Sequence, residues 1–421
     1  MIIGRQNGFR RAHLAWFTLA ALACSNGCGS DGPGVRVIGE DGLDLPLRAA
    51  TADERATFFD GDGAFGLPFR APDGLGPLYI RTNCESCHAE GVRGPGTVQK
   101  MAIVGADGVT PAADQSQLPY GHTVRPLMAA DATMPLLPPA SGWPADAGLK
   151  VTIRMPASVL GRGYMEAVDD LEIERIEREQ AGRTDAIHGR INRVTYQSEP
   201  NPDATFNPHQ RGQTGLIGRF GLKARIATLD EFAADAFQGD MGVTSVMRPT
   251  EAPNPQGLAD DAKPGLDVDI DTLNLVARYM RFIEIPTRNP AVATTRARDV
   301  FEQVGCATCH VPTLRTRADY PIAHLAGIDA PIYSDLLVHD MGADLSDGLV
   351  DGSALSSEWR TAPLIGLRFQ RTFLHDGRAH NIEEAITLHG GTGSQAAASA
   401  ARFAALADAD RAALIAFVES L

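Results

Sequence analysis

Two short stretches of the chain carry two cysteines one helical turn apart, followed directly by a histidine. They read CESCH at 84–88 and CATCH at 306–310. Two thiols at this spacing add to the two vinyl groups of a haem, and the next histidine supplies the proximal nitrogen to the iron. A zinc site requires a further Cys or His pair nearby, and a redox-active CxxC requires no following His. The spacing therefore predicts two covalently bound haems c, attached through Cys84, Cys87, Cys306 and Cys309, with His88 and His310 as iron ligands.

The ligand on the other side of each iron decides whether a haem only carries electrons or also binds a small oxidant. For the second haem, Met341 is the candidate, and thioether ligation there would raise the reduction potential. A buried methionine that fills a gap in the core is the alternative. For the first haem, His122 and Met241 are the candidates.

Helical patterns flank both motifs. An amphipathic segment at 294–304 runs into the second motif, and apolar residues at helical spacing follow at 404–421. A similar segment at 271–285 ends before Pro286 and Pro290, where the chain is expected to leave one domain and enter the next. We therefore expect a mainly α fold of two cytochrome c-like domains, at 51–286 and 290–421, with long loop insertions in the first.

The N-terminus resembles a secretion signal. Three arginines without an acidic residue precede an apolar run that is too short to span a bilayer. The run ends at Cys24, which is typical of a bacterial lipoprotein signal; a plain signal peptide is the alternative. We expect residues 1–23 to be removed, residues 24–50 to form a flexible tether, and the protein to be periplasmic, with a lipid on Cys24 anchoring it to the outer membrane.

Composition narrows the class of protein. The 421 residues are 44% hydrophobic and 21% charged, which is ordinary for a globular protein. The formal net charge is −14. Because phosphates must be met by Lys and Arg, this balance argues against a nucleic-acid partner.

Three further segments are similar to the bacterial di-haem oxidoreductase family, whose members are also described as thiol oxidoreductases. The segments are DLLVHDMG at 335–342, EWRTAPLIG at 358–366 and FLHDGRAHNIEEAI at 373–386. The family is related to the bacterial di-haem cytochrome c peroxidases. An internal repeat agrees, because FGLKA at 220–224 followed by TLDE at 228–231 echoes the HDGRA segment. The first copy lacks the Trp, Asp and Arg that the peroxidases carry there.

The resemblance implies roles for several residues. Asp240 lies where the related peroxidases carry an acid that exchanges protons near the iron, so Asp240 is the candidate general acid and base; a salt bridge is the alternative. Those peroxidases also hold calcium, for which Asp267, Asp269 and Asp271 are candidate ligands here, although helix capping is a simpler explanation.

Together these features predict a periplasmic di-haem c-type oxidoreductase. It would exchange electrons with a small periplasmic redox protein and have peroxidase-like chemistry, on a small oxidant or substrate, at one haem. One alternative is a di-haem electron carrier without chemistry of its own. The other is a thiol oxidoreductase, which requires free thiols in the CxxC pairs.

Overall fold

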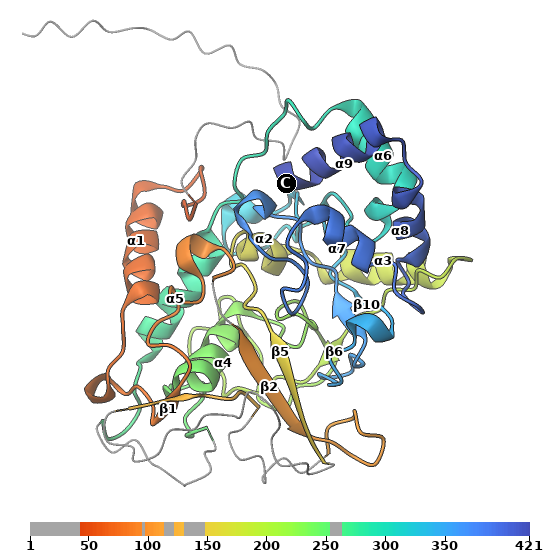
Figure 1. Ribbon diagram of the computed structural model, residues 1–421. Helices are drawn as coiled ribbons and strands as arrows, with labels where there is room; N and C mark the ends of the chain where they lie inside the picture. Colours follow the sequence, from red (N-terminus) through yellow and green to blue (C-terminus); the bar gives the residue numbers. More distant parts are fainter. Residues whose placement is uncertain (1–42, 95–96, 113–121, 130–147, 253–262) are drawn as a thin grey trace, which may run out of the picture. The chain divides into compact units, whose positions relative to one another are not determined.

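The computed structural model describes residues 43–94, 97–112, 122–129, 148–252 and 263–421 (Figure 1). All of them fall within one contact unit, Pro33–Leu421. The expected signal peptide, Cys24 and most of the expected tether lie outside the described residues. None of the described helices combines the length and the hydropathy that crossing a membrane requires.

Helices α1 (Ala52–Gly66) and α5 (Ile270–Phe282) pack side by side next to the first CxxCH motif (Figure 1). Gly61 permits this close approach, because a Cβ atom there would lie 2.8 Å from both the Leu275 carbonyl oxygen and the Tyr279 Cβ. The same helices bring aromatic rings to the motif. Phe65 contacts Tyr279 at a ring-centroid distance of 5.0 Å, and its ring lies 6.1 Å from that of His88.

A second helix pair stands next to the second motif. Helix α6 (Thr295–Val304) ends at Gly305, whose φ of 93° permits the turn into Cys306, and α6 packs on α9 (Asp408–Ser420). The Phe301 and Phe417 rings meet across the pair at 5.5 Å. The helices predicted at 271–285, 294–304 and 404–421 are thus present, the last divided between α8 and α9.

The remaining helices are shorter or lie between the two pairs. Val168 and Asp169 separate two of them, so Glu166 lies on a short buried helix that ends before the charged helix at Asp170–Ala181 begins. The other α-helices are α2 (Arg162–Ala167), α3 (Asp170–Ala181), α4 (Leu229–Met241), α7 (Ile382–Leu388) and α8 (Ala397–Ala404). Short 3₁₀ helices occur at Ala71–Asp73, Ala89–Gly91, Cys306–Thr308, Ala323–Leu325, Ala343–Leu345 and Leu367–Phe369.

The expectation of a mainly α fold is wrong. Helices, 3₁₀ turns included, account for only 34% of the structure and strands and bridges for 14%, so the fold is mixed α/β with small sheets. Each sheet is an antiparallel pair: β1 (Leu78–Tyr79) with β4 (Leu127–Met128), β2 (Val98–Ile103) with β5 (Leu149–Arg154), β6 (Arg193–Val194) with β7 (Leu216–Ile217), β8 (Leu314–Arg315) with β9 (Asp329–Ala330), and β10 (Val338–Asp340) with β11 (Glu358–Arg360).

The physical reason for this error lies in the segments between the helix pairs. The chain carries 43 Gly and 27 Pro, which interrupt helices and favour turns. The segments β2 and β5 contain Val and Ile and pair over six residues, from Val98 opposite Arg154 to Ile103 opposite Leu149. The segment expected to be loop insertions therefore contains the longest sheet among the described residues.

The largest buried cluster draws on both sides of the predicted domain boundary. It includes Met165 and Phe237 from the first part of the chain and Leu325 and Leu337 from the second. A second cluster surrounds α6 and α9 and contacts Cys306. The division into domains at 286 and 290 remains a prediction.

A buried arginine joins three of the central helices. The guanidinium of Arg281, at the end of α5, donates to both carboxylate oxygens of Glu166 on α2 at 2.6 and 3.1 Å, and to both of Asp230 on α4 at 2.9 and 3.0 Å. The Tyr320 hydroxyl also donates to Glu166, at 2.8 Å. Each carboxylate oxygen of Glu166 and Asp230 thus accepts at least one hydrogen bond within the network.

Replacing Arg281 with Met should destabilise the protein strongly, because two buried carboxylates would lose their cation. We expect a loss of about 3–5 kcal/mol in the free energy of unfolding. Arg175→Met is the matched control, since Arg175 also binds two carboxylates, those of Glu172 and Glu179, but on the surface of α3. Its loss should cost less than about 1 kcal/mol. Equal shifts in urea unfolding curves would contradict the proposed role of burial.

Candidate functional site

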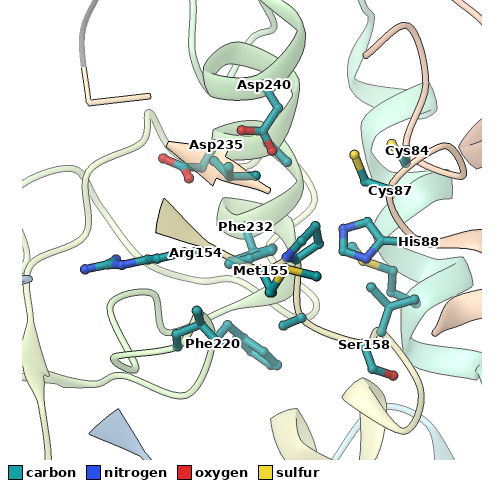
Figure 2. A pocket seen from close by; sticks show the side chains of 18 of the residues that line it. Cys84, Cys87, His88, Arg154, Met155, Ser158, Phe220, Phe232, Asp235 and Asp240 are labelled. Carbon is teal, nitrogen blue, oxygen red and sulfur yellow. The ribbon is translucent and has the colours of Figure 1, made fainter. Parts of the chain in front are cut away.

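The first motif forms a single tight turn after β1. The amides of Cys87 and His88 both donate to the Cys84 carbonyl, each at 3.0 Å. This turn directs the two sulfur atoms and the His88 ring toward one cavity (Figure 2). The geometry meets the requirement for a haem linked by two thioethers, because the two thiols and the imidazole line the same cavity.

His88 is suited to bind a metal. Burial, helped by the positive charge of Arg162, lowers the pKa of its imidazole to about 4, although the nearby Ala157 carbonyl acts in the opposite direction. The ring is therefore neutral near pH 7 and keeps a lone pair on one nitrogen. No described residue hydrogen-bonds the buried Nδ1 atom. A buried imidazole without a full set of protein partners, in a cavity with two thiols, fits an iron ligand.

The cavity has room for a large planar ligand. It contains about 1250 Å³ of empty space, solvent at its mouth included. Apolar walls come from Phe220, from Phe232 on α4 and from Met155, and Figure 2 shows these side chains on the same side of the space as Asp235 and Asp240. The cavity thus combines apolar walls with several charged side chains, and an apolar pocket with polar groups at defined positions is typical of a cofactor site.

Two carboxylates of α4 line the cavity in opposite electrostatic settings. Asp235 pairs with Arg225, and although burial opposes it, this pairing holds the pKa of Asp235 well below its usual range. Burial raises the pKa of Asp240, and the charge of Lys100 only partly opposes this. The Asp240 carboxyl has no ion pair or hydrogen bond with any described residue. Neighbouring acids with pKa values pushed apart are typical of acid–base sites.

The second motif is a 3₁₀ turn that leads into His310. The His310 amide donates to the Cys306 carbonyl at 2.9 Å. The Nδ1 atom lies 3.1 Å from the carbonyl of Tyr333, whose ring packs on Phe301 and Phe417. A proton held on Nδ1 by a backbone carbonyl leaves Nε2 available for iron, which is the usual second contact of a metal-binding histidine. Burial lowers the pKa of His310 to about 4.

A polar network adjoins Cys309. The Nδ1 atom of His339 lies 3.7 Å from the Cys309 sulfur and 2.9 Å from the Gln395 side-chain oxygen, and its Nε2 lies 2.9 Å from the Asp335 carboxylate. Burial opposes protonation of His339, but Asp335 outweighs burial and raises the pKa of His339 well above its usual value. Cys309, Asp335 and His339 are close enough together to hold a metal ion. A thioether at Cys309 would remove the thiolate from that set.

The other predicted residues are distributed unevenly. Met241 is buried and lines the first cavity, whereas the His122 side chain is exposed and is not among the lining residues. Met341 follows β10 and is half-buried. Of the candidate calcium ligands, Asp267 accepts from the Thr244 amide and hydroxyl, and Asp269 caps α5; Asp271 lies in the first turn of α5.

His389 is a further histidine near the second motif, beyond the residues predicted from the sequence. This residue ends α7, and its Nδ1 lies 2.6 Å from the Ala385 carbonyl, so Nε2 is available. Its charge acts on the His310 ring. A histidine before Gly390 and Gly391 at the end of the helix that follows HDGRA was the signal that could have identified it.

Comparisons with known proteins give one informative match. A family described as "Di-haem oxidoreductase, putative peroxidase" matches residues 145–421, which include the second motif but not the first. None of the curated proteins matches. Among solved structures, hydrazine synthase from Kuenenia stuttgartiensis, pressurized with xenon, aligns at 14% identity over 96% of this chain and 100% of that chain, with a TM-score of 0.35. Because its family match covers well over half of its length, the chain belongs to the di-haem oxidoreductase family.

Proposed function

We propose that this protein binds two haems c covalently and transfers electrons between them, and that a small oxidant such as peroxide is reduced in the first cavity. The observation that carries the proposal is the pair of CxxCH turns, each with a buried, neutral imidazole. Cys84, Cys87 and His88 would hold one haem, and Cys306, Cys309 and His310 the other. Bound haem supplies a one-electron redox centre and, where its sixth position is open, a place where oxidants react.

Residues of the chain would supply the proton, fix nearby charges, exclude water and orient the imidazole. Asp240 holds a proton at its carboxyl group because burial disfavours the charged form, and it would donate that proton to an oxygen atom of the oxidant. Asp235 stays ionised beside Arg225 and fixes the position of that cation. Phe220 and Phe232 keep water from the apolar side of the cavity. At the second motif, the Tyr333 carbonyl orients the His310 ring.

Burial also weighs against the thiol oxidoreductase alternative. It raises the pKa of Cys84 to about 12 and that of Cys306 to about 12. Because the thiolate is the nucleophile in thiol–disulfide exchange, cysteines in this environment would react slowly as free thiols. Thioether formation with haem gives these buried sulfurs an uncharged role instead.

Location and partner follow from the haem chemistry as further parts of the proposal. Haem c is attached outside the cytoplasm, so export through the N-terminal signal and anchoring at Cys24 are consistent with two CxxCH motifs. A small periplasmic redox protein would supply the electrons.

Haem counting tests the proposal directly. The exported full-length protein should carry two haems per chain by pyridine haemochrome assay and by mass. The double variants C84A/C87A and C306A/C309A should each carry one, because each loses a single pair of thioether links. Replacing Cys24 and Cys28 with Ser is the control and should leave both haems in place. A colourless wild-type protein would refute the proposal.

A matched pair of substitutions tests the proton donor. Asp240→Asn should lower the rate of peroxide reduction on the order of 100-fold or more, because an amide cannot supply the proton. Asp235→Asn should have a much smaller effect, since Asp235 is ionised and paired. The assay is stopped-flow oxidation of the reduced protein by peroxide. No spectral change at either haem in the wild type would favour the electron-carrier alternative.

The second haem should be six-coordinate, as a centre that only relays electrons requires. We expect His389 rather than Met341 to bind its iron as well, because burial lowers the pKa of His389 and keeps its ring neutral, its Nε2 is available, and it lies near enough to His310 to influence that ring. His389→Leu should convert one low-spin signal to high-spin in the electron paramagnetic resonance spectrum, and added imidazole should restore it. The reverse pattern, in which only Met341→Leu changes the spectrum, would assign Met341.

A further inference from the structure

Two buried guanidinium groups face the first cavity without a carboxylate partner. Arg162 lies at the start of α2 and Arg360 at the end of β11, and both line the cavity. Their exposed fractions are only 7% and 6%. A cation this far from water normally requires a counter-charge, because desolvation costs several kcal/mol or more.

The contacts of these two arginines are with neutral groups. Arg162 Nε donates to the Ser158 carbonyl at 2.6 Å, and Nη1 lies 2.7 Å from the Met165 sulfur. Arg360 Nε donates to the Gly221 carbonyl at 3.1 Å, and Nη1 donates to its neighbour's carbonyl, that of Thr361, at 2.8 Å. Neither forms an ion pair with a carboxylate of the described chain. Carbonyl oxygens satisfy N–H groups, but they do not neutralise the charge.

Two other arginines in the same cavity wall are neutralised by carboxylates. Arg154 binds the carboxylates of Asp347 at 2.7 Å and Asp351 at 2.9 Å. Arg225 binds Asp235. The fold thus places carboxylates beside Arg154 and Arg225. It places none beside the two buried guanidiniums of Arg162 and Arg360.

The two guanidiniums also repel each other. Burial, together with the charge of Arg360, lowers the pKa of Arg162 to about 9. Burial lowers the pKa of Arg360 to about 10, with only Asp335 acting in the other direction. Because Asp335 already binds His339 and Gln180, it is not a full counter-ion for Arg360. An anionic ligand between the two guanidiniums would reduce both their mutual repulsion and the free-energy cost of burying their charges.

Building on the proposed function, we infer that Arg162 and Arg360 bind the two propionate carboxylates of the haem attached at residues 84–88. A haem brings two carboxylates, and two guanidiniums are available. Arg162 lies close enough to His88 for its charge to act on that ring. Guanidinium groups are preferred for partly buried carboxylates because their forked N–H groups match the two oxygens.

Arg360 also connects the first cavity with the second motif. Arg360 pairs with Val338 in the β10–β11 sheet, and the next residue of β10, His339, lies 3.7 Å from the Cys309 sulfur. A residue from the C-terminal part of the chain therefore completes the first haem site. The two arginines become binding residues that fix the orientation of the first haem relative to the second motif.

The test uses the full-length holoprotein and the midpoint potential of each haem as a function of pH. In the wild type, two guanidiniums should keep the propionates ionised across the neutral range. In Arg162→Gln or Arg360→Gln, a buried propionate should take up a proton on reduction, so the potential of the first haem should fall at alkaline pH and become pH-dependent. Arg175→Gln is the control, because Arg175 lies on the surface of α3 and is not among the cavity-lining residues, and it should leave the wild-type pH dependence unchanged.

Several outcomes would overturn the inference. One is an unchanged pH dependence in both Gln variants with two haems per chain. Another is a shift of the wild-type potential on addition of acetate that is absent from the Gln variants. The two arginines would then bind an exchangeable anion instead of the propionates. If a Gln variant does not fold, Arg162→Lys and Arg360→Lys keep the charge, and shifted propionate bending bands in their resonance Raman spectra should report the altered contact; unchanged bands would count against it. Absence of haem at 84–88 would instead refute the proposed function, and the haemochrome assay reports that separately.

Discussion

The buried ion network of Arg281 is the constraint on which the first site depends. It fastens α2, α4 and α5 to one another through Glu166 and Asp230. Those helices carry much of what surrounds the first motif: α2 begins with Arg162, α4 presents Asp235 and Asp240, and α5 packs on the helix that precedes the motif. Gly163 belongs to the same arrangement, because a Cβ atom there would lie 1.9 Å from the Arg281 carbonyl oxygen. An apolar replacement of this network could be equally stable, but it would have to reproduce the same spacing of three helices.

The same arrangement of two packed helices supports both motifs. A helix before the motif packs against a later helix, and aromatic rings from that pair lie against the motif or its supporting carbonyl. At the first motif Phe65 lies near His88, and at the second Tyr333 joins the helix rings to the His310 Nδ1 atom. The imidazoles are consequently held by packed elements rather than by mobile loops, which is what an iron ligand requires.

Local spacing predicted the chemistry better than it predicted the fold. The six residues of the two CxxCH motifs lie in tight turns, and Asp240 lines the first cavity from the end of α4. The expected α fold was wrong because Gly, Pro and β-branched residues between the helices form turns and strand pairs. Arg162 and Arg360 could not be identified from the sequence, since their importance lies in a missing counter-charge, which only the folded chain reveals. His389 was missed because a single histidine at a helix end has no distinctive spacing.

The ion pair between Arg225 and Asp235 determines how the remaining charges of the first cavity are used. Because Asp235 is held as a carboxylate, it cannot serve as a proton donor, and of the α4 acids that line the cavity, the one with a raised pKa is Asp240. Arg225 is neutralised by that pair, and Arg154 is neutralised by two further acids. Neither guanidinium therefore has an uncompensated charge that would attract a ligand anion. The guanidiniums that do are Arg162 and Arg360. The placement of a few acids thus assigns one part of the cavity to proton transfer and another to holding an anion, so that a propionate-bearing ligand and a small oxidant would occupy different regions of the same space.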